Sequence, residues 1–214
     1  AAWNLLGAVY LSNADHGNAE KAFNTAIALE PGNPKASLGL AAIARKNEDL
    51  GAAKDYLEPA LRLHPDNARL LYGAAEIAIA DERMAEAERL LTQAINIDDR
   101  FNPARVLLAR LLIKANRSDE AVSVLSRAPA KDVGISITLG EAYFDMGRVD
   151  EAKDLFESLV RTTPTSLPVL FGLARVYETL DDRKGLGTTL DRILELAPGN
   201  PDASLAKARL LVFD

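Results

Sequence analysis

The sequence predicts an all-α protein in which antiparallel helix pairs stack into a solenoid. Residues of the same kind return with a period of 34 positions, prolines interrupt the helical pattern between periods, and short polar turns interrupt it within each period. A unit of two short helices cannot bury its apolar face alone, so each unit must pack against its neighbours. The first period is marked by Trp3, Leu6, Gly7, Tyr10, Ala19, Phe23, Ala26 and Pro31.

Each period has small and large apolar residues at regular places. Small residues hold the eighth position, as Gly7, Ala41, Ala75, Ala109, Gly140, Ala174 and Ala208. Alanine at the twentieth position is followed four residues later by a large residue, as in Ala19 with Phe23, Ala53 with Leu57, Ala87 with Leu91, Ala121 with Leu125, and Ala152 with Phe156. Four residues make about one helical turn, so each such pair lies on the apolar face of an amphipathic helix.

Helix-breaking residues divide the chain twice in each period. Between periods the chain reads Glu30-Pro31-Gly32-Asn33-Pro34, His64-Pro65-Asp66-Asn67, Thr163-Pro164 and Ala197-Pro198-Gly199-Asn200-Pro201. Proline cannot continue a helix, and glycine and asparagine tolerate the turn that follows. Turns within the periods are expected at 13–17, 47–50, 81–84, 116–119, 146–149 and 180–183. Turns this short force the paired helices to run antiparallel.

These residues resemble the tetratricopeptide repeat (TPR) family, whose pattern is Trp, Leu, Gly, Tyr, Ala, Phe, Ala and Pro at the same relative positions. The resemblance covers the whole chain and implies a right-handed superhelical solenoid; other helix-pair solenoids are the alternative folds. Six repeats and the first helix of a seventh are expected, at 1–33, 34–67, 68–101, 102–132, 133–166, 167–200 and 201–214. Because both ends fall within predicted first helices, we expect a fragment of a longer array.

Two repeats depart from the pattern. The fourth is three residues short, and Pro129 stands where its second helix should continue, so we expect that helix to end early and the curvature to change between repeats four and five. In the sixth repeat, Leu186 replaces the small residue, and Gly185 and Gly187 each weaken the second helix by about 1 kcal/mol relative to alanine.

Composition excludes several classes of function. A net charge of −6 and a pI near 5.1 argue against nucleic-acid binding, which needs a basic face. No apolar run approaches the ~20 residues that span a bilayer, so we expect no direct membrane insertion. The absence of cysteine excludes disulfides, thiol nucleophiles and thiolate metal sites. A chain without cysteine suits the periplasm and the cytoplasm equally, so the compartment stays open.

We expect no enzyme activity, no cofactor and no metal site. His16 and His64 fall in predicted turns, without a second ligand or a serine partner at a suggestive spacing. Acidic pairs such as Asp98 with Asp99 lie at helix ends, where the helix dipole explains some of them. The glycines at 185 and 187 lack the spacing of a phosphate-binding loop.

In the TPR family the first helix of each repeat lines a concave groove, so the resemblance places a partner-binding site there. The candidates are Lys35, Leu38, Arg45, Lys46, Arg69, Tyr72, Glu76, Val106, Arg110, Lys114, Glu141, Phe144, Phe171 and Arg175. Over all groove-facing positions of the family, eight basic and five acidic side chains give a net charge of +3. This charge favours an extended partner with acidic and apolar groups, and a solvated face without a specific ligand is the alternative. Asn4, Ala8 and Gly39 do not match the clamp with which co-chaperone members grip a chaperone tail.

These observations predict a noncatalytic protein–protein interaction scaffold that binds an extended peptide or partner surface in its groove. By resemblance alone, a bacterial envelope or exopolysaccharide assembly system is the favoured setting. The alternative is a regulatory or targeting TPR domain of a larger enzyme or transcription regulator. A third expectation is self-association through the apolar ends of the array, which include Phe213.

Overall fold

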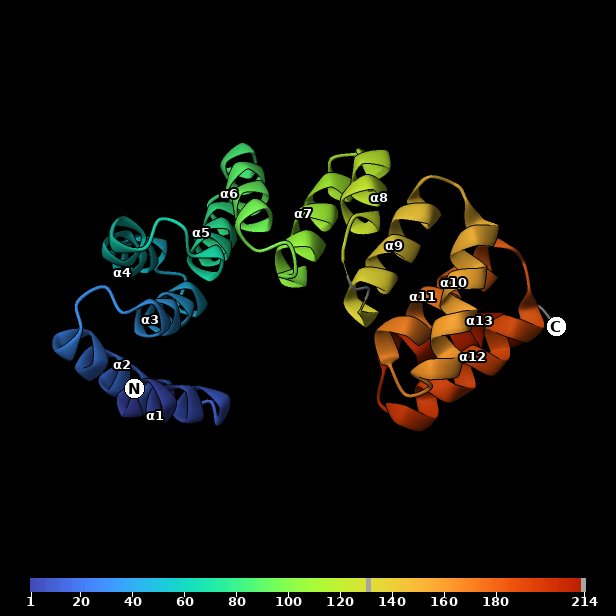
Figure 1. The fold of residues 1–214 in the computed structure, drawn as a ribbon. Helices are drawn as coiled ribbons and strands as arrows, with labels where there is room; N and C mark the ends of the chain where they lie inside the picture. The colour runs from blue at the N-terminus through green and yellow to red at the C-terminus, as the bar shows by residue number, and fades with distance from the viewer. Residues whose placement is uncertain (130–131, 213–214) are drawn as a thin grey trace. The chain divides into compact units, whose positions relative to one another are not determined.

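The computed structural model describes residues 1–129 and 132–212, which hold thirteen α-helices and no strand (Figure 1). The helices are α1 (Ala2–Ser12), α2 (His16–Leu29), α3 (Pro34–Lys46), α4 (Leu50–Leu63), α5 (Ala68–Ala80), α6 (Met84–Ile97), α7 (Asn102–Lys114), α8 (Ser118–Ser126), α9 (Val133–Asp145), α10 (Val149–Thr162), α11 (Leu167–Thr179), α12 (Arg183–Leu196) and α13 (Pro201–Val212). Consecutive helices form antiparallel pairs, so the predicted all-α class is confirmed.

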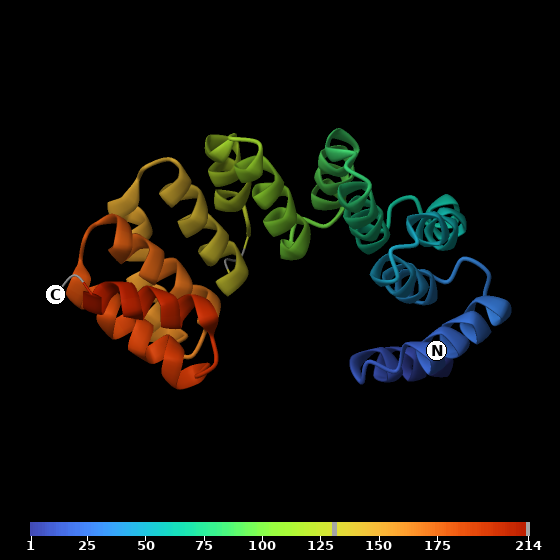
Figure 2. The same ribbon diagram turned by 180° about the vertical axis from the view of Figure 1, so that it is seen from behind.

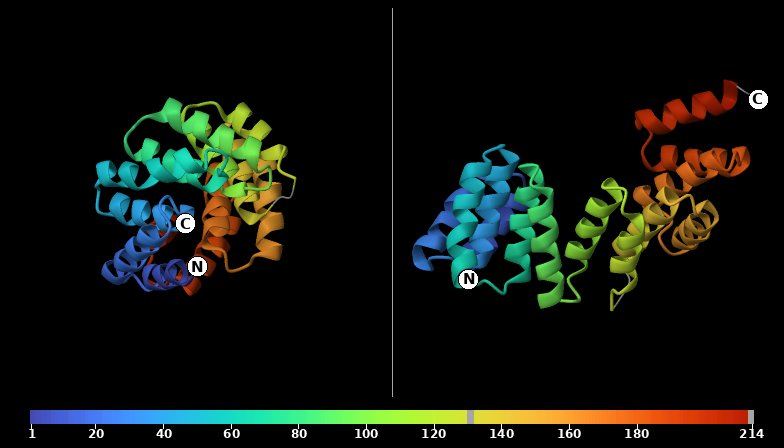
Figure 3. Two further views of the ribbon diagram at one scale, coloured as in Figure 1. Left: turned by 60° about the vertical axis from the view of Figure 1, so that its left-hand side comes forward. Right: turned by 90° about the horizontal axis from the view of Figure 1, so that it is seen from above.

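The chain divides into two compact units, Ala1–Ala104 and Arg105–Asp214, which we call the N-terminal and C-terminal units. In the N-terminal unit each first helix packs on its own second helix, and each second helix packs on the next first helix (Figure 2). The C-terminal unit follows the same order from α9 onward, and α13 packs against α12 (Figure 3). First helices also contact one another, α1 with α3, α3 with α5, and α9 with α11, so they lie side by side in each unit.

Phe23 occupies the closest helix approach in the N-terminal unit. Its ring is 3% exposed and lies between Gly7 on α1 and Gly39 on α3. A Cβ atom added to Gly7 would lie 2.6 Å from Phe23 Cε1, and one added to Gly39 would lie 2.4 Å from Cε2. Both distances are too short for van der Waals contact, so the ring requires glycine on each side.

Phe156 repeats this arrangement in the C-terminal unit, between Gly140 on α9 and Gly172 on α11. Added Cβ atoms would lie 2.7 Å and 2.4 Å from its ring. Where the large residue is leucine, the small residue at the eighth position is alanine, as in Leu57 with Ala41, Leu91 with Ala75, Leu125 with Ala109, and Leu190 with Ala174, all of them buried. Phenylalanine on the second helix is thus paired with glycine on the first, and the smaller leucine is paired with the larger alanine. Close packing requires that the two sizes compensate each other in this way.

Each turn within a repeat is three residues long and closes the first helix in the same way. Its middle residue has a left-handed backbone with φ between 55° and 73°, at Ala14, Glu48, Glu82, Asn116, Gly147 and Asp181. The next residue donates its N–H five positions back, as Asp15 does to the Tyr10 carbonyl. This is a Schellman closure, which usually holds glycine, yet five of these six residues have side chains. The left-handed conformation of a residue with a side chain costs roughly 1–2 kcal/mol. The packing of the two helices against each other must offset this cost.

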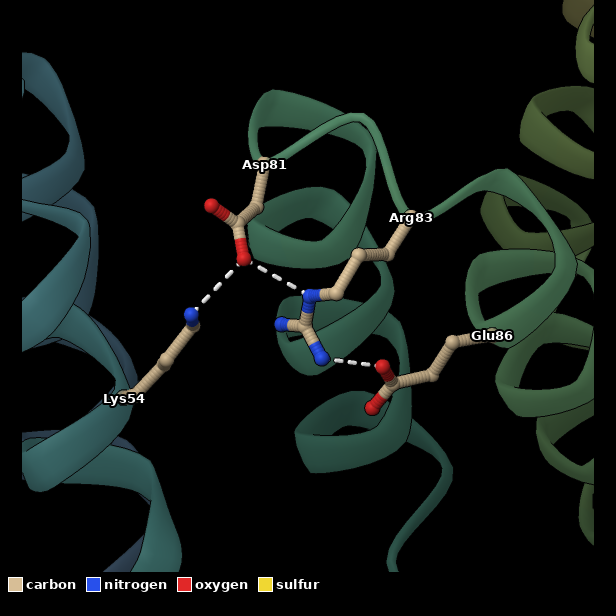
Figure 4. Close-up of polar contacts among 4 residues, drawn as sticks. All are labelled: Lys54, Asp81, Arg83 and Glu86. Atoms are coloured by element: carbon tan, nitrogen blue, oxygen red, sulfur yellow. Dashed lines mark hydrogen bonds and ion pairs between the residues drawn. The ribbon is translucent and has the colours of Figure 1, made fainter.

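The second helices begin in one of two ways. In α2, α4 and α12 an aspartate accepts the N–H of the residue three positions later, as Asp15, Asp49 and Asp182 do. In α6, α8 and α10 an arginine takes that place and pairs with a glutamate in the first turn, as Arg83 does with Glu86, Arg117 with Glu120, and Arg148 with Glu151 (Figure 4 shows the first). A glutamate there is favourable because it faces the positive end of the helix dipole.

The two irregular repeats have local explanations. Helix α8 has nine residues, whereas the other second helices have 14, so its early end is confirmed. Gly185 donates its N–H to the cap Asp182, and a Cβ on the buried Gly187 would lie 3.3 Å from Leu210 Cδ2 on α13. The latter glycine therefore permits a close helix approach. The change of curvature between repeats four and five stays a prediction.

Two residues differ from their expected places. Trp3 marks the first period, as the apolar positions of the TPR pattern do, yet it is 42% exposed, because only α2 and α3 pack against α1 among the described helices. His16, expected in a turn, is the first residue of α2, and its Nε2 atom lies 2.7 Å from Lys46 Nζ. Phe213, named for self-association through the array ends, lies outside the described residues.

We expect Gly140→Ala to lower the free energy of unfolding by about 1–3 kcal/mol, because the new methyl group must displace the Phe156 ring. Gly17→Ala is the control: an added Cβ meets nothing within 4 Å, and the higher helix propensity of alanine raises stability by up to about 1 kcal/mol. Urea unfolding followed by circular dichroism measures both. Adding Phe156→Leu to Gly140→Ala recreates the leucine–alanine pair and should recover at least about 0.5 kcal/mol against the sum of the single changes. Strict additivity would contradict size matching.

Candidate functional site

The side-by-side first helices carry the fourteen candidate residues, seven in each compact unit. The N-terminal first-helix surface consists of Lys35, Leu38, Arg45, Lys46, Arg69, Tyr72 and Glu76, on α3 and α5. The C-terminal first-helix surface consists of Val106, Arg110, Lys114, Glu141, Phe144, Phe171 and Arg175, on α7, α9 and α11. All fourteen are exposed or half-buried, so they are accessible to a partner. That a partner binds at these residues stays a prediction.

An ion pair joins α3 to α5 on the N-terminal first-helix surface. Arg45 Nη2 donates to Glu76 Oε1 at 3.4 Å. Partial burial raises the pKa of Glu76, and the charge of Arg45 opposes that rise. Part of the predicted basic charge is therefore already neutralised within the protein.

An aromatic cluster lies beside this pair. The rings of Tyr72 and Phe101 meet edge to face, with centroids 5.5 Å apart, and the Arg69 guanidinium lies 5.7 Å from the Phe101 centroid. Sequence reasoning missed Phe101, which is the last residue of the third repeat, outside the groove positions of the family. The signal was present, because five other first helices follow directly on a polar residue: Asn33, Asn67, Asp132, Ser166 and Asn200.

A polar pocket of about 390 Å³ opens at the start of α3 and α5. It is lined by Ala1, Asn4, Glu30, Asn33, Pro34, Lys35, Leu38, Asn67 and Arg69. Asn4 Nδ2 donates to Asn33 Oδ1 at 3.0 Å, and Asn33 Nδ2 donates to a Glu30 carboxylate oxygen at 2.5 Å. Asn4 Oδ1 is buried without a hydrogen-bond partner in the structure. The pocket thus offers one unused acceptor beside the cationic side chains of Lys35 and Arg69.

A row of alternating charge crosses the C-terminal first-helix surface. Arg110, Glu141 and Arg175 hold the ninth position of three successive repeats. Arg110 Nε lies 3.8 Å from Glu141 Oε2, and the Arg175 guanidinium lies 4.1 Å from the centroid of the Phe144 ring. At that distance the cation–π contact holds the guanidinium against the ring face.

Glu141 is the group of this row whose pKa the fold raises. Partial burial raises the pKa of its carboxyl group, while the nearby charges of Arg110 and Arg175 lower it. The rise prevails, so the fold disfavours the charged form of Glu141.

A second pocket of about 410 Å³ continues the C-terminal surface toward α13. Phe171, Arg175 and Glu178 line it from α11, Leu186 and Leu190 from α12, and Asp202, Leu205 and Arg209 from α13. The floor is apolar and the charged side chains of both signs stand around it. Such a pocket suits an apolar side chain with polar groups on either side of it.

Neither a metal-binding cluster nor a membrane-spanning helix is found in the part of the chain that the structure describes. No group of three or more His, Cys, Asp or Glu side chains within residues 1–129 and 132–212 could hold a metal ion. None of the described helices combines the length and apolar character needed to cross a membrane.

Sequence models of the tetratricopeptide repeat match residues 4–53, 44–100, 78–135 and 133–176. The chain belongs to the tetratricopeptide repeat family. The matched ranges contain both first-helix surfaces, up to and including Arg175. One curated relative, the uncharacterized protein ycf37 of Pyropia yezoensis, is 32% identical over 69 residues, which are 32% of this TPR chain and 39% of the relative. The match therefore spans less than half of that relative's length.

Solved structures share the fold at low sequence identity. A chain of the APC/C hetero-tetramer Cut9–Hcn1 superposes with a TM-score of 0.79 and 17% identity, over 98% of this TPR chain and 42% of its own length. YrrB, a TPR protein with an unusual peptide-binding site, superposes with a TM-score of 0.61 and 21% identity. The match covers 88% of this TPR chain and 99% of YrrB. PilW, a type IV pilus biogenesis factor, superposes with a TM-score of 0.72 and 18% identity. The match covers 82% of this TPR chain and 84% of PilW. These identities establish similarity of fold alone.

We expect Arg175→Met to raise the pKa of Glu141 further, because the variant removes one of the two cations that lower it. Carbon-13 NMR titration of the Glu141 carboxyl group measures this pKa. Since the folded-state pKa lies above the unfolded one, the contribution of Glu141 to stability is present at low pH and is lost as the pH rises through the folded pKa. Glu141→Gln should therefore gain stability relative to wild type as the pH rises from about 4 to about 7. A difference that stays constant over this range would contradict the raised pKa.

Proposed function

We propose that this TPR chain is a noncatalytic scaffold that holds an extended segment of a partner protein on its first-helix surfaces. TPR proteins are in general noncatalytic interaction modules, and the fold suggests that role here. The row of Arg110, Glu141 and Arg175, one residue in each successive repeat, is the observation that carries the proposal. Groups that recur once per repeat suit a ligand that runs across several helices better than a compact small molecule.

The chemistry of the surfaces supports a partner with both acidic and apolar groups. Arg69 and Arg175 lie against aromatic rings, and such a contact fixes the orientation of the planar guanidinium, whose N–H fork suits a carboxylate. Tyr72 and Phe171 offer apolar contact area nearby. At Arg45 and Arg110 a partner carboxylate would have to compete with Glu76 and Glu141, so we assign these two arginines the weaker role.

The proposed setting is a bacterial envelope or exopolysaccharide assembly system. It is supported by similarity of fold to the pilus biogenesis factor PilW, and the peptide-binding mode by similarity of fold to YrrB. A regulatory or targeting domain of a larger enzyme or transcription regulator is the second candidate. It is favoured by the match to a chain of Cut9–Hcn1, of which this TPR chain covers only 42%.

Charge removal from the C-terminal first-helix surface tests the proposal. The full-length protein captures its partner from its own cell extract, and calorimetry then measures the affinity of the purified pair. We expect replacement of Arg110, Lys114 and Arg175 by alanine to weaken binding at least about tenfold, because the proposal places Lys114 and Arg175 in direct contact with the partner and gives Arg110 a weaker contact.

The matched control replaces Lys21, Arg89 and Arg161 by alanine. These residues are exposed, lie on the second helices α2, α6 and α10, and carry the same total charge. We expect the control to bind within about twofold of wild type. Equal affinities for the two triple variants would refute the placement of the partner on the first helices.

A further inference from the structure

One of the six full repeats lacks leucine at its seventh position. Leucine holds this position in five of the repeats, as Leu6, Leu40, Leu108, Leu139 and Leu173, and alanine holds it in the third, as Ala74. The last four of these leucines are buried, with at most 6% of their surface exposed. Ala74 is only partly buried although its side chain is much smaller. The missing side-chain carbons therefore leave an open space instead of a closed contact.

That space is a pocket of about 430 Å³ in the N-terminal unit. Its apolar lining consists of Leu57 and Leu61 on α4 and of Ala74 and Ile77 on α5. It shares no residue with the N-terminal first-helix surface, so it is a separate feature of the same unit. Pockets of a few hundred Å³ with apolar walls are the usual size of ligand sites, and this one exceeds what a single leucine at position 74 would occupy.

The five charged side chains around the pocket all have ion-pair partners. Lys54 Nζ donates to Asp81 Oδ2 at 2.8 Å, and Arg83 Nε donates to the same oxygen at 2.7 Å (Figure 4). Arg83 also pairs with Glu86, and Arg62 lies 3.5 Å from Glu58. The hydrogen bonds from Lys54 and Arg83 hold the pKa of Asp81 below its usual range, so this carboxylate keeps its charge. A rim neutralised in this way complements an apolar group better than a charged one.

The shape of the pocket follows the α4 helix. Its lining residues on α4 are Lys54, Leu57, Glu58, Leu61 and Arg62, which lie on one face over about two turns, or roughly 12 Å. Leu57 and Leu61 are one turn apart. Apolar side chains one turn apart on another helix would match this spacing, as in helix-in-groove recognition.

We propose that this pocket binds a short amphipathic helix of a partner protein, which inserts two apolar side chains spaced one turn apart over Ala74. The recognition is apolar, and the paired rim excludes an unpaired charge of the partner. This interaction goes beyond the proposed first-helix function and does not depend on it.

A defined helical probe tests the proposal on the full-length protein. The probe is a peptide of roughly 18 residues, rich in alanine and in Glu–Lys pairs to favour the helix, with two leucines four residues apart; its matched partner has alanines in their place. Carbon-13 methyl NMR of Leu57, Leu61 and Ile77 locates the binding, and the titration gives the affinity. We expect the leucine peptide to shift these methyl signals and to bind at least about tenfold more tightly than the alanine peptide.

Two variants separate the pocket from the rest of the surface. Ala74→Leu places in the third repeat the residue that five others carry, and thermal unfolding confirms that it folds. We expect this variant to bind the leucine peptide at least about tenfold more weakly than the wild-type protein does. Ala28→Leu makes the same addition at an exposed site on α2 and should leave the affinity unchanged. Raising the salt from about 50 to about 500 mM should change the wild-type affinity by less than about twofold, because the rim charges are already paired.

The proposal is overturned if the Ala74→Leu protein binds the leucine peptide as tightly as the wild-type protein does. It is equally overturned if the wild-type protein binds the alanine peptide as tightly as the leucine peptide. It is also overturned if the shifted signals belong to the first-helix surface, if salt abolishes binding, or if about 1 mM of the leucine peptide, a concentration that detects even the weakest specific complexes, shifts none of the three residues.

Discussion

The contact between a small residue on each first helix and a large residue on its second helix is the constraint on which the rest of this structure depends. Phe23 and Phe156 each fill the space between two glycines, and leucine accompanies alanine in the other repeats. Because packed side chains cannot overlap, the sizes of the two residues must change together. This contact sets how closely the helices of a pair approach, and it therefore aligns the first helices that carry the candidate partner-binding residues.

The turns show how that packing supports local structure. Five of the six turns within repeats place a residue with a side chain in the left-handed region, where glycine would cost less. The helices on both sides are held by buried contacts. Their packing therefore forces the middle residue of the turn into a backbone conformation that is unfavourable for a residue with a side chain. The second helices then begin with an aspartate cap or with an arginine–glutamate pair, two solutions to the same problem of unsatisfied amide groups and helix dipole.

Several of the candidate binding features lie where the chain departs from its repeat pattern. Phe101 replaces a polar cap residue and joins Tyr72 in an aromatic cluster, and Ala74 replaces leucine and opens a pocket. Glu141 alternates with Arg110 and Arg175, and its pKa is raised by burial. A regular repeat supplies stability, and an irregular residue within it supplies a surface that differs from its neighbours. The first-helix surfaces combine charge with aromatic rings, whereas the pocket over Ala74 is aliphatic inside a neutralised rim, so the two suit different ligand chemistries.

The sequence by itself determined the helix pairs and the short eighth helix, because proline, glycine spacing and apolar periodicity act through local backbone geometry and helix faces. It also predicted accessible candidate residues such as Arg45 and Arg175, since each lies at a fixed place in the repeat. Only the tertiary structure decided which side chains meet, as Arg45 with Glu76 or Arg175 with Phe144. It also decided that Trp3 is exposed and that Ala74 opens a pocket. Contacts between residues about thirty positions apart depend on how successive pairs pack, and no local pattern contains that information.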